Sequence, residues 1–220
     1  MELLEGIKTR RSIRAFKSTP IPEETIRSIL EAAKKSPSYT NTQPWEVTVV
    51  TGKKRDELSK ILLDLAASGA ASSPDMTLPE KWPPELEKRS REHHTKRATF
   101  LGLDTGGGLQ GQKSWTMNLG FYGAPCVIFL FMDSTLGSWS VFDMGIFAQS
   151  LILAAHSFGV GSCLQAMTTR YPDAVRDFLG IPATKKLVIG ISMGYPDPED
   201  RANAYQSDRI NLEDFVKWYS

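Results

Sequence analysis

The sequence predicts an α+β fold in which helices surround a single sheet. Segments with helical periodicity outnumber segments with strand character, and the two kinds follow one another in mixed order instead of alternating regularly. The length of 220 residues suits one compact domain, and we expect residues 1–220 to form it. Hydrophobic residues make up 41% of the chain and charged residues 23%, which excludes disordered, collagen-like and coiled-coil proteins.

The N-terminal part is predicted to contain three helices and one strand. A short helix carries apolar residues on one face over residues 3–7, and a second helix over 22–33 has acids in its first turn and apolar residues at helical spacing. A turn-rich run over 36–44 leads into a strand over 45–51. The third helix is predicted over 56–67.

Residues from about 70 to 118 are predicted to form a variable insertion that lies on the body of the domain. Proline- and serine-rich stretches flank a charged helix over 85–101, and a glycine cluster follows at 106–108. Acidic and basic residues alternate along this helix, which indicates a solvated face.

After the insertion, strands and helices alternate. Val141 to Phe158 is the most apolar helix and is hydrophobic almost all round, so it must be buried in a core or between subunits. The other predicted elements are strands over 126–132, 161–165 and 187–193, a helix over 172–179, and a terminal strand or helix over 212–219.

Charge and composition narrow the choice of partners. The net charge of +1 provides no general attraction to nucleic acid or to an anionic membrane. The longest unbroken apolar run, 124–132, is too short to span a bilayer, and no secretory leader is recognised at the start. Cys126 and Cys163 are the only cysteines and have no metal-like spacing. We therefore expect a cytoplasmic protein.

Motifs of common nucleotide and metal sites are incomplete. Residues 106–111 match GxGxxG, but the dinucleotide fingerprint needs a strand before it and a helix after it, and neither is predicted. Gln112 interrupts the spacing of a phosphate loop. His93 and His94 lack an HExxH pattern or a nearby thiol, so no metal site is predicted. The glycine-rich stretch is interpreted as a surface loop, with a substrate lid as the alternative.

One basic cluster suits an anionic ligand. Arg10, Arg11 and Arg14 stand close to Ser12, and guanidinium forks with a hydroxyl match the geometry of phosphate oxygens. A solubilising basic patch is the alternative, and composition alone does not separate the two.

Five segments, taken in order, resemble the FMN-dependent nitroreductase family over nearly the whole chain outside 70–115. They are Arg10–Arg14, Ser36–Trp45, Phe121–Pro125, Asp143–Gln165, and Gly190–Pro196 followed by Asn203 and Arg209. The resemblance implies a central, mostly antiparallel sheet flanked by helices, and a homodimer with two FMN molecules at the subunit interface.

The resemblance also implies the cofactor-binding residues. The FMN phosphate is expected to contact Arg10, Ser12 and Arg209, with Arg11 contributing through its backbone, while Arg14 is expected near the pyrimidine edge. The other subunit is expected to supply Pro37, Ser38, Tyr39 and Asn41. Leu164, Gln165 and Ala166 are expected to face the isoalloxazine, with a backbone donor near N5.

These implied roles agree with flavin chemistry. Negative charge gathers near N1 of a flavin that accepts hydride, so a guanidinium there raises the reduction potential. Because the flavin N5 carries the reaction, no catalytic side chain is expected. We therefore predict an FMN-dependent oxidoreductase that takes hydride from NADPH or NADH and reduces nitroaromatics, quinones or similar electron-poor molecules in a ping-pong sequence.

Some alternatives remain at this point. The same fold serves reductive dehalogenases, enone reductases and flavin-fragmenting enzymes, and a non-catalytic flavin-binding protein is a further alternative. Within the insertion, Lys113, Trp115 and Asn118 are the nearest candidates for another pyrimidine-edge ligand. Trp82, Phe100 and Trp115 either form walls of a substrate site or simply pack, and packing is favoured. The sequence leaves the physiological substrate and the choice between NADH and NADPH open.

Overall fold

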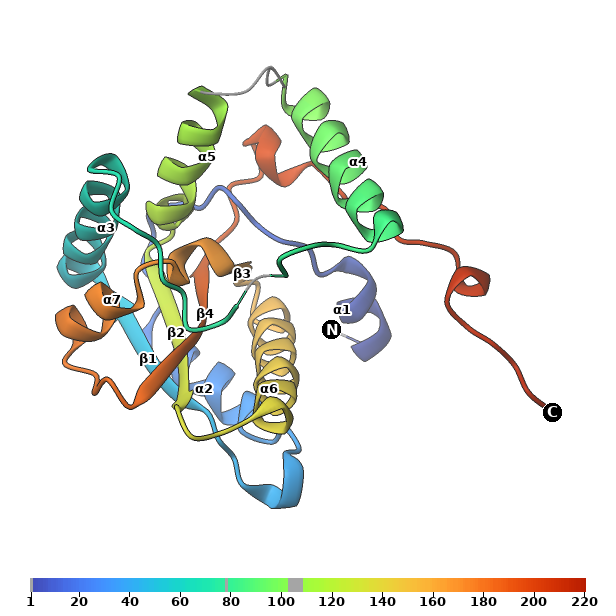
Figure 1. Ribbon diagram of the computed structural model, residues 1–220, viewed down its shortest axis with the longest axis horizontal. Helices are drawn as coiled ribbons and strands as arrows, with labels where there is room; N and C mark the ends of the chain where they lie inside the picture. The colour runs from blue at the N-terminus through green and yellow to red at the C-terminus, as the bar shows by residue number, and fades with distance from the viewer. Residues whose placement is uncertain (1, 78, 103–108) are drawn as a thin grey trace.

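The computed structural model describes residues 2–77, 79–102 and 109–220, and the side chains of all of these except 109–113. Figure 1 shows a sheet with helices on both faces and a C-terminal tail that extends away from the body. The elements are α1 (Leu3–Thr9), α2 (Glu23–Ala33), η1 (Tyr39–Asn41), β1 (Glu46–Thr51), α3 (Gly52–Ala67), α4 (Pro84–Leu101), α5 (Leu109–Leu119), η2 (Phe121–Gly123), β2 (Cys126–Asp133), α6 (Ser138–Ser157), β3 (Gly161–Gln165), η3 (Ala166–Thr169), α7 (Pro172–Leu179), β4 (Lys185–Gly194), η4 (Arg201–Asn203) and η5 (Leu212–Asp214).

The described strands form one four-stranded sheet in the order β1-β2-β4-β3. Each neighbouring pair is antiparallel, so the predicted α+β class and the mostly antiparallel sheet are both confirmed. The sheet is irregular at one point, between Leu130 and Phe131 of β2, where the register against β4 shifts. Strand β3 pairs only with β4 and forms an edge of the sheet.

Strand β2 is buried on both faces and divides the core in two. Its side chains alternate, because successive residues of a strand point to opposite faces. Cys126, Ile128, Leu130 and Met132 pack with apolar residues of α2 and α6. Val127, Phe129 and Phe131 pack with apolar residues of α3, α5 and α7. The result is three layers, with the sheet between two helical layers (Figure 1).

Two predicted regions differ from the structure. A helix, α5, begins at Leu109, and its residues Leu119 and Trp115 belong to the core on the α3 side. The end of the insertion is therefore part of the core, because these apolar residues cover one face of the sheet. Residues 212–219 form neither a strand nor a long helix: only the short turn η5 is present there. The cluster 106–108 lies outside the described residues.

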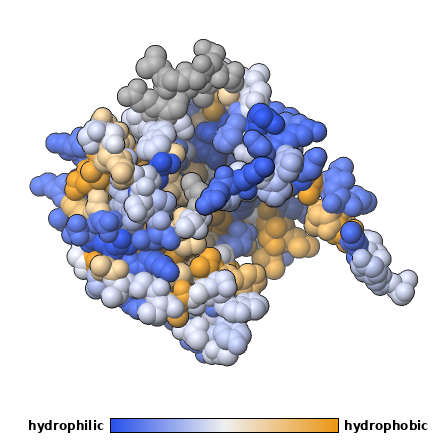
Figure 2. Space-filling model, in the orientation of Figure 1, coloured by the Kyte–Doolittle hydropathy of each residue, from blue (hydrophilic) through white to orange (hydrophobic). Residues whose placement is uncertain are grey.

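Large apolar side chains are exposed along one side of the molecule. They belong to α1, to the start and end of α6, and to the tail: Leu3, Leu4, Ile7, Trp139, Phe142, Phe158, Leu212, Phe215, Trp218 and Tyr219. Figure 2 shows hydrophobic atoms around the base of the tail and on the tail itself. Within the described part of the chain, α6 is the one helix long and apolar enough to cross a membrane, by length and composition only.

Candidate functional site

The arginine-rich segment after α1 is fixed to the edge strand β3. Ser12 forms a parallel bridge with Ser162, and the amide of Ile13 donates to the carbonyl of Ser162 at 2.9 Å. The side chain of Ile13 is buried, and its Cγ1 would lie 2.7 Å from a Cβ at Gly161. A side chain at position 161 would therefore displace the segment, so β3 begins with the one residue that lets Ile13 approach.

Asn203 joins the same segment to the tail. Its side-chain oxygen accepts hydrogen bonds from the backbone N–H of Arg14 at 2.8 Å and of Ala15 at 3.2 Å. Its amide nitrogen donates to the carbonyl of Ala15 at 2.7 Å and of Asp197 at 2.9 Å. The side chain is buried and fully used, so it fixes the position of Arg14 relative to the residues that follow 203.

A cavity of about 560 Å³ opens beside this segment. It has the size of ordinary small-molecule sites. Its lining includes five residues predicted to contact the cofactor: Arg10, Arg11, Ser12, Arg14 and Arg209. His93 of α4 and Tyr205 of the tail complete its wall. A larger cavity of about 700 Å³ lies between α2 and the start of α3 and shares no lining residue with the arginine cluster, so the smaller one is the better candidate site.

The electrostatics of the cavity favour an anion. Burial, together with the nearby Arg209 guanidinium, lowers the pKa of Arg10. Burial also lowers the pKa of His93, with further contributions from His94, Arg14, Arg97 and Arg209. No acidic side chain lines the cavity in the described part of the chain. Like charges held together without a counter-ion raise the free energy of the empty site, and a bound anion reverses this.

Helix α4 contributes a face that sequence reasoning assigned to solvent. His93, Arg97 and Phe100 lie on one side of the helix because they are three or four residues apart. The rings of His93 and Phe100 pack on Tyr205, with centroids 5.8 and 5.5 Å away. The spacing of three and four residues between His93, Arg97 and Phe100 was the signal in the sequence for a common face of the helix. The alternating charges around these residues indicated a solvated helix instead, so this inward face was not predicted.

The aromatic residues of the insertion are divided between packing and exposure. Phe100 packs on Tyr205 and lies 5.2 Å from the Arg201 guanidinium, while the ring of Trp115 lies 4.2 Å from Arg170. Trp82 is exposed. Phe100 and Trp115 therefore contact other side chains of the fold, and whether they also form walls of a substrate site stays a prediction.

Strand β3 presents Leu164 to solvent and buries Gln165. The Gln165 amide donates to the backbone carbonyl of Asn118 at 2.9 Å, and its oxygen accepts a hydrogen bond from the Ser192 hydroxyl. Asn118 in turn donates to Ser114 at 2.9 Å. The side chains of Gln165 and Asn118 are thus occupied within the fold, and the Gln165 carbonyl accepts a hydrogen bond from the Thr168 hydroxyl at 2.8 Å. The side chain of Lys113 lies outside the described residues.

Residues 37–41 lie at the other end of α6. The Tyr39 amide donates to the buried Asp143 carboxylate at 3.1 Å, and the Tyr39 ring stacks on Trp139 at 5.8 Å. At the opposite end of the helix, the Thr9 hydroxyl and His156 Nε2 are 2.8 Å apart. Positions 143 and 156 are about 20 Å apart along the axis, at a rise of about 1.5 Å per residue. Pro37, Ser38, Tyr39 and Asn41 therefore do not reach the arginine cluster of their own chain.

Comparison with known proteins decides the family. The model of the nitroreductase family matches residues 7–195. The chain belongs to the nitroreductase family. Nitroreductase NfnB from Mycolicibacterium smegmatis is 37% identical over 214 residues, which are 96% of this chain and 90% of that protein. A 4-nitrobenzoate reductase from Pseudomonas putida is 33% identical over 96% of this chain and 92% of its own length.

A solved structure shows the same fold. The crystal structure of the FMN-dependent nitroreductase NfnB from Mycobacterium smegmatis in complex with NADPH superposes with a TM-score of 0.94 at 36% identity. The match covers 99% of this chain and 97% of that one. The resemblance drawn from five sequence segments is thereby confirmed for family and for fold.

Replacing Asn203 by alanine tests the connection between the tail and the arginine segment. Four hydrogen bonds are lost, and three backbone groups lose the partner that Asn203 supplied, while the Ala15 carbonyl still accepts from the Asp197 amide at 3.1 Å. At least two of these groups are expected to stay poorly solvated, so the free energy of unfolding falls by about 2–3 kcal/mol. Urea unfolding followed by circular dichroism measures the change. Asn211→Ala, which removes only local bonds in an exposed turn, is the control and is expected to cost no more than about 1 kcal/mol. Equal stability of the two variants would contradict the role of Asn203.

Proposed function

We propose that this nitroreductase is an FMN-dependent NAD(P)H oxidoreductase that reduces nitroaromatics, quinones or similar electron-poor molecules. The observation that carries the proposal is the cationic cavity in which Arg10, Ser12, Arg14 and Arg209 converge without an acidic residue in its described lining. The relatives that are 37% and 33% identical are named as a nitroreductase and a 4-nitrobenzoate reductase, which supports the substrate class.

The residues present fit FMN. Arg10, Ser12 and Arg209 offer charged and hydroxyl donors to a phosphate, and Arg11 contributes to the same wall of the cavity. Arg14 lies farther along the segment, where Asn203 fixes its backbone, and we propose its side chain for the pyrimidine edge. The Gln165 side chain and its carbonyl are occupied within the fold, so a backbone N–H of Leu164 or Gln165 is the group that we propose for the contact with the ring.

When bound, FMN supplies the chemistry: it accepts hydride from NAD(P)H and passes it to the substrate. The role of the protein is to bind the cofactor, NAD(P)H and the substrate and to orient them. The guanidinium groups of Arg10 and Arg209 would hold the anionic end of FMN, and the Arg14 side chain would supply positive charge to the ring edge that is negative in a reduced flavin. No side chain of this chain is assigned a proton or a bond in that scheme.

The site is proposed to be shared between two copies of the chain in a homodimer. Residues 37–41 and the arginine cluster lie at opposite ends of α6, so antiparallel pairing of two α6 helices across a twofold axis brings the one next to the other. The exposed Trp139 and Phe142, 65% and 62% accessible in the single chain, supply the apolar surface for this pairing. Such pairing also gives α6 an apolar environment other than a membrane.

The same proposal extends to the organisation and location of the chain. One domain spans residues 1–220, and the insertion at about 70–118 shapes the entrance to the site through α4. Both cysteines are free thiols, which supports a reducing, cytoplasmic compartment.

The decisive experiment uses purified protein and added FMN. The protein is expected to take up FMN and turn yellow, to lose the colour anaerobically with NADPH or NADH, and to regain it on addition of 4-nitrobenzoate. Absorbance near the flavin maximum follows all three steps. A protein that binds no FMN, or one whose bound FMN neither nicotinamide reduces, would overturn the proposal.

Removal of one phosphate contact is expected to weaken FMN binding. Arg10→Ala and Arg209→Ala each delete a charge-assisted contact of about 1.5–3 kcal/mol, so the dissociation constant rises about 10- to 100-fold. Fluorescence titration of the apoproteins measures it. Arg27→Ala, on the exposed side of α2 and paired with Glu23, removes the same charge away from the cavity and is expected to bind FMN like the wild type. Unchanged affinity in both test variants would refute the phosphate assignment.

Mixed dimers test the sharing of the site. Arg10→Ala and Asn41→Ala chains are each expected to bind FMN poorly as homodimers. Because a mixed dimer has both substitutions in one site and none in the other, it is expected to retain one high-affinity FMN per two chains. Differently tagged chains, purified as heterodimers and titrated with FMN, give this stoichiometry. Two weakened sites in the heterodimer would show that each site belongs to a single chain.

A further inference from the structure

The loop of residues 38–43 has a strained backbone. Thr40, Asn41 and Gln43 have φ angles of 49°, 60° and 50°, in the left-handed region that residues other than glycine rarely adopt. The conformation is least favourable at Thr40, because its side chain is branched at Cβ. Strain of this kind persists only where the surroundings of a segment impose it, and it gathers at functional sites. The loop therefore needs a contact that imposes its shape.

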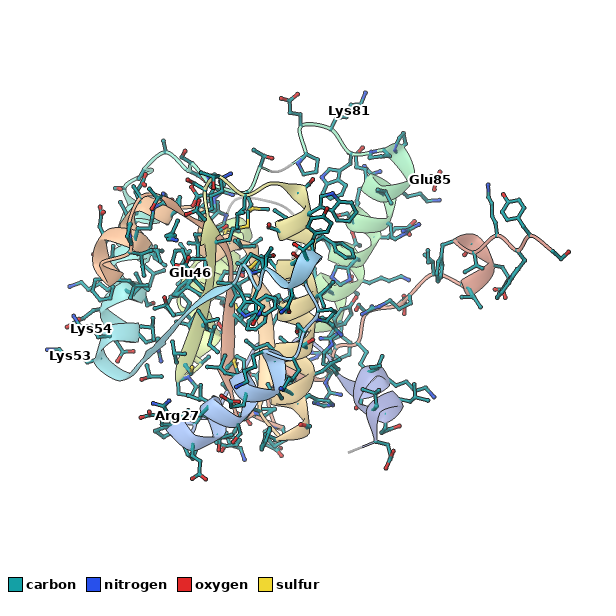
Figure 3. All side chains as sticks on the ribbon, turned by 90° about the horizontal axis from the view of Figure 1, so that it is seen from below. Arg27, Glu46, Lys53, Lys54, Lys81 and Glu85 are labelled. Carbon is teal, nitrogen blue, oxygen red and sulfur yellow. The ribbon has the colours of Figure 1, made fainter. Side chains whose placement is uncertain are left out.

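Local bonds and packing do not supply this contact. The loop stands between α2, which carries Arg27, and β1, which begins at Glu46, and both residues are labelled in Figure 3. Bonds inside the loop close its turns, as where the amide of Gln43 donates to the Ser38 hydroxyl at 2.9 Å. Residues 39–43 are exposed, so they have little packing that could fix them to the body of the domain.

Asp143 of α6 connects the loop to the body. Its two carboxylate oxygens accept the Tyr39 N–H at 3.1 and 3.2 Å. In the described part of the chain, this is the only contact by hydrogen bonds between residues 38–43 and another segment. The next residues on the inner face of α6, Met144 and Phe147, are buried in the core, so the carboxylate stands on a rigid support.

A carboxylate at this position is costly without such a contact. Asp143 is 3% exposed, and no lysine, arginine or histidine of the described residues forms a salt bridge with it. It lies beyond the first turn of α6, so it does not cap the free amides at the start of the helix. Buried carboxylates are retained where hydrogen bonds satisfy them, and the Tyr39 N–H is the donor that the fold provides. Holding the loop is therefore the task that accounts for Asp143.

We infer that Asp143 is a positioning residue for the FMN site of the partner subunit: it fixes the loop in the shape that places Ser38, Tyr39 and Asn41 against FMN bound to the other copy. The inference rests on the proposed sharing of the site and adds to it a residue that does not itself touch the cofactor. Because Asp143 acts by accepting a backbone N–H, another side chain with an oxygen at the same place can replace it. Because it acts through the loop of its own chain, its loss damages the site of the other copy.

Substitution of Asp143 tests the contact. Asp143→Ala leaves the Tyr39 N–H without its acceptor and releases the loop, so the dissociation constant of FMN from the homodimer is expected to rise about tenfold. Asp143→Asn keeps an oxygen acceptor in a side chain of the same shape and is expected to stay within about threefold of the wild type. Fluorescence titration of the apoproteins measures both. Asp133→Ala is the matched control, because Asp133 accepts the Thr135 amide at 3.0 Å in a different turn, and it is expected to bind FMN like the wild type.

Mixed dimers show in which copy Asp143 acts. An Asp143→Ala chain paired with an Arg10→Ala chain places both substitutions in one site, so this dimer is expected to retain one high-affinity FMN. The same chain paired with an Asn41→Ala chain leaves a substitution in each site, so no high-affinity FMN is expected. Heterodimers of differently tagged chains, titrated with FMN, give the two stoichiometries. The reverse pattern, or loss of high-affinity binding in both heterodimers, would overturn the inference.

The remaining outcomes separate the inference from the proposed function. Asp143→Ser, whose hydroxyl is one bond shorter than the carboxylate, takes the place of the alanine variant if that variant does not fold. Wild-type affinity in the alanine or serine variant, or an asparagine variant as weak as these, would overturn the role of Asp143 while FMN binding stands. Absence of FMN binding by the wild type itself would overturn the proposed function and the inference together.

Discussion

Repulsion among positively charged side chains is the constraint on which the site depends. Arg10, Arg14 and Arg209 line one cavity from two separate parts of the chain, although no carboxylate in its described lining neutralises them. Neutral contacts provide the opposing force: the four hydrogen bonds of Asn203, the bridge from Ser12 to β3, and the packing of Tyr205 on α4. Packing and hydrogen bonding thus offset the repulsion among the guanidinium groups. A bound anion makes the same arrangement of charges favourable.

The fold could be predicted from the sequence wherever hydrophobic periodicity was strong. The stripe of α2, the unbroken apolar run of β2 and the all-round apolar helix α6 are each present with boundaries close to those expected. Helix α5 was missed because its exposed and buried residues show little periodicity, although Trp115 and Leu119 pack in the core. The end of the chain was misjudged for a different reason: residues 212–219 are rich in large apolar residues, but these side chains are exposed and only the short turn η5 forms there.

The candidate site could be predicted in part. A run of arginines with a serine next to a helix indicated a site for an anion, and the structure brings Arg10 to Arg14 and Arg209 to one cavity. His93 could not be found in this way, because its place in the wall of the cavity depends on which face of α4 meets Tyr205, and this contact joins residues about a hundred positions apart. Residues 37–41 could be assigned only through resemblance to a family. The distance between residues 37–41 and the arginine cluster within one chain depends on the length of α6 and on the packing at its two ends. The local sequence around residues 37–41 does not reveal this distance.

The position of the arginine segment on β3 has a consequence for heating. Strand β3 has a neighbour on one side only, and the segment is attached to it by a single bridge and by Ile13 against Gly161. Margins of sheets open more easily than their centres, where β2 is enclosed on both faces. Moderate warming is therefore expected to release Ser12 and Ile13 from β3 before the two cores open, while the bridge of Phe16 to Pro196 holds the end of the segment. A ligand bound by the arginine segment stabilises this edge of the sheet against local opening. Dissociation of the ligand and unfolding of the domain are therefore expected at two different temperatures.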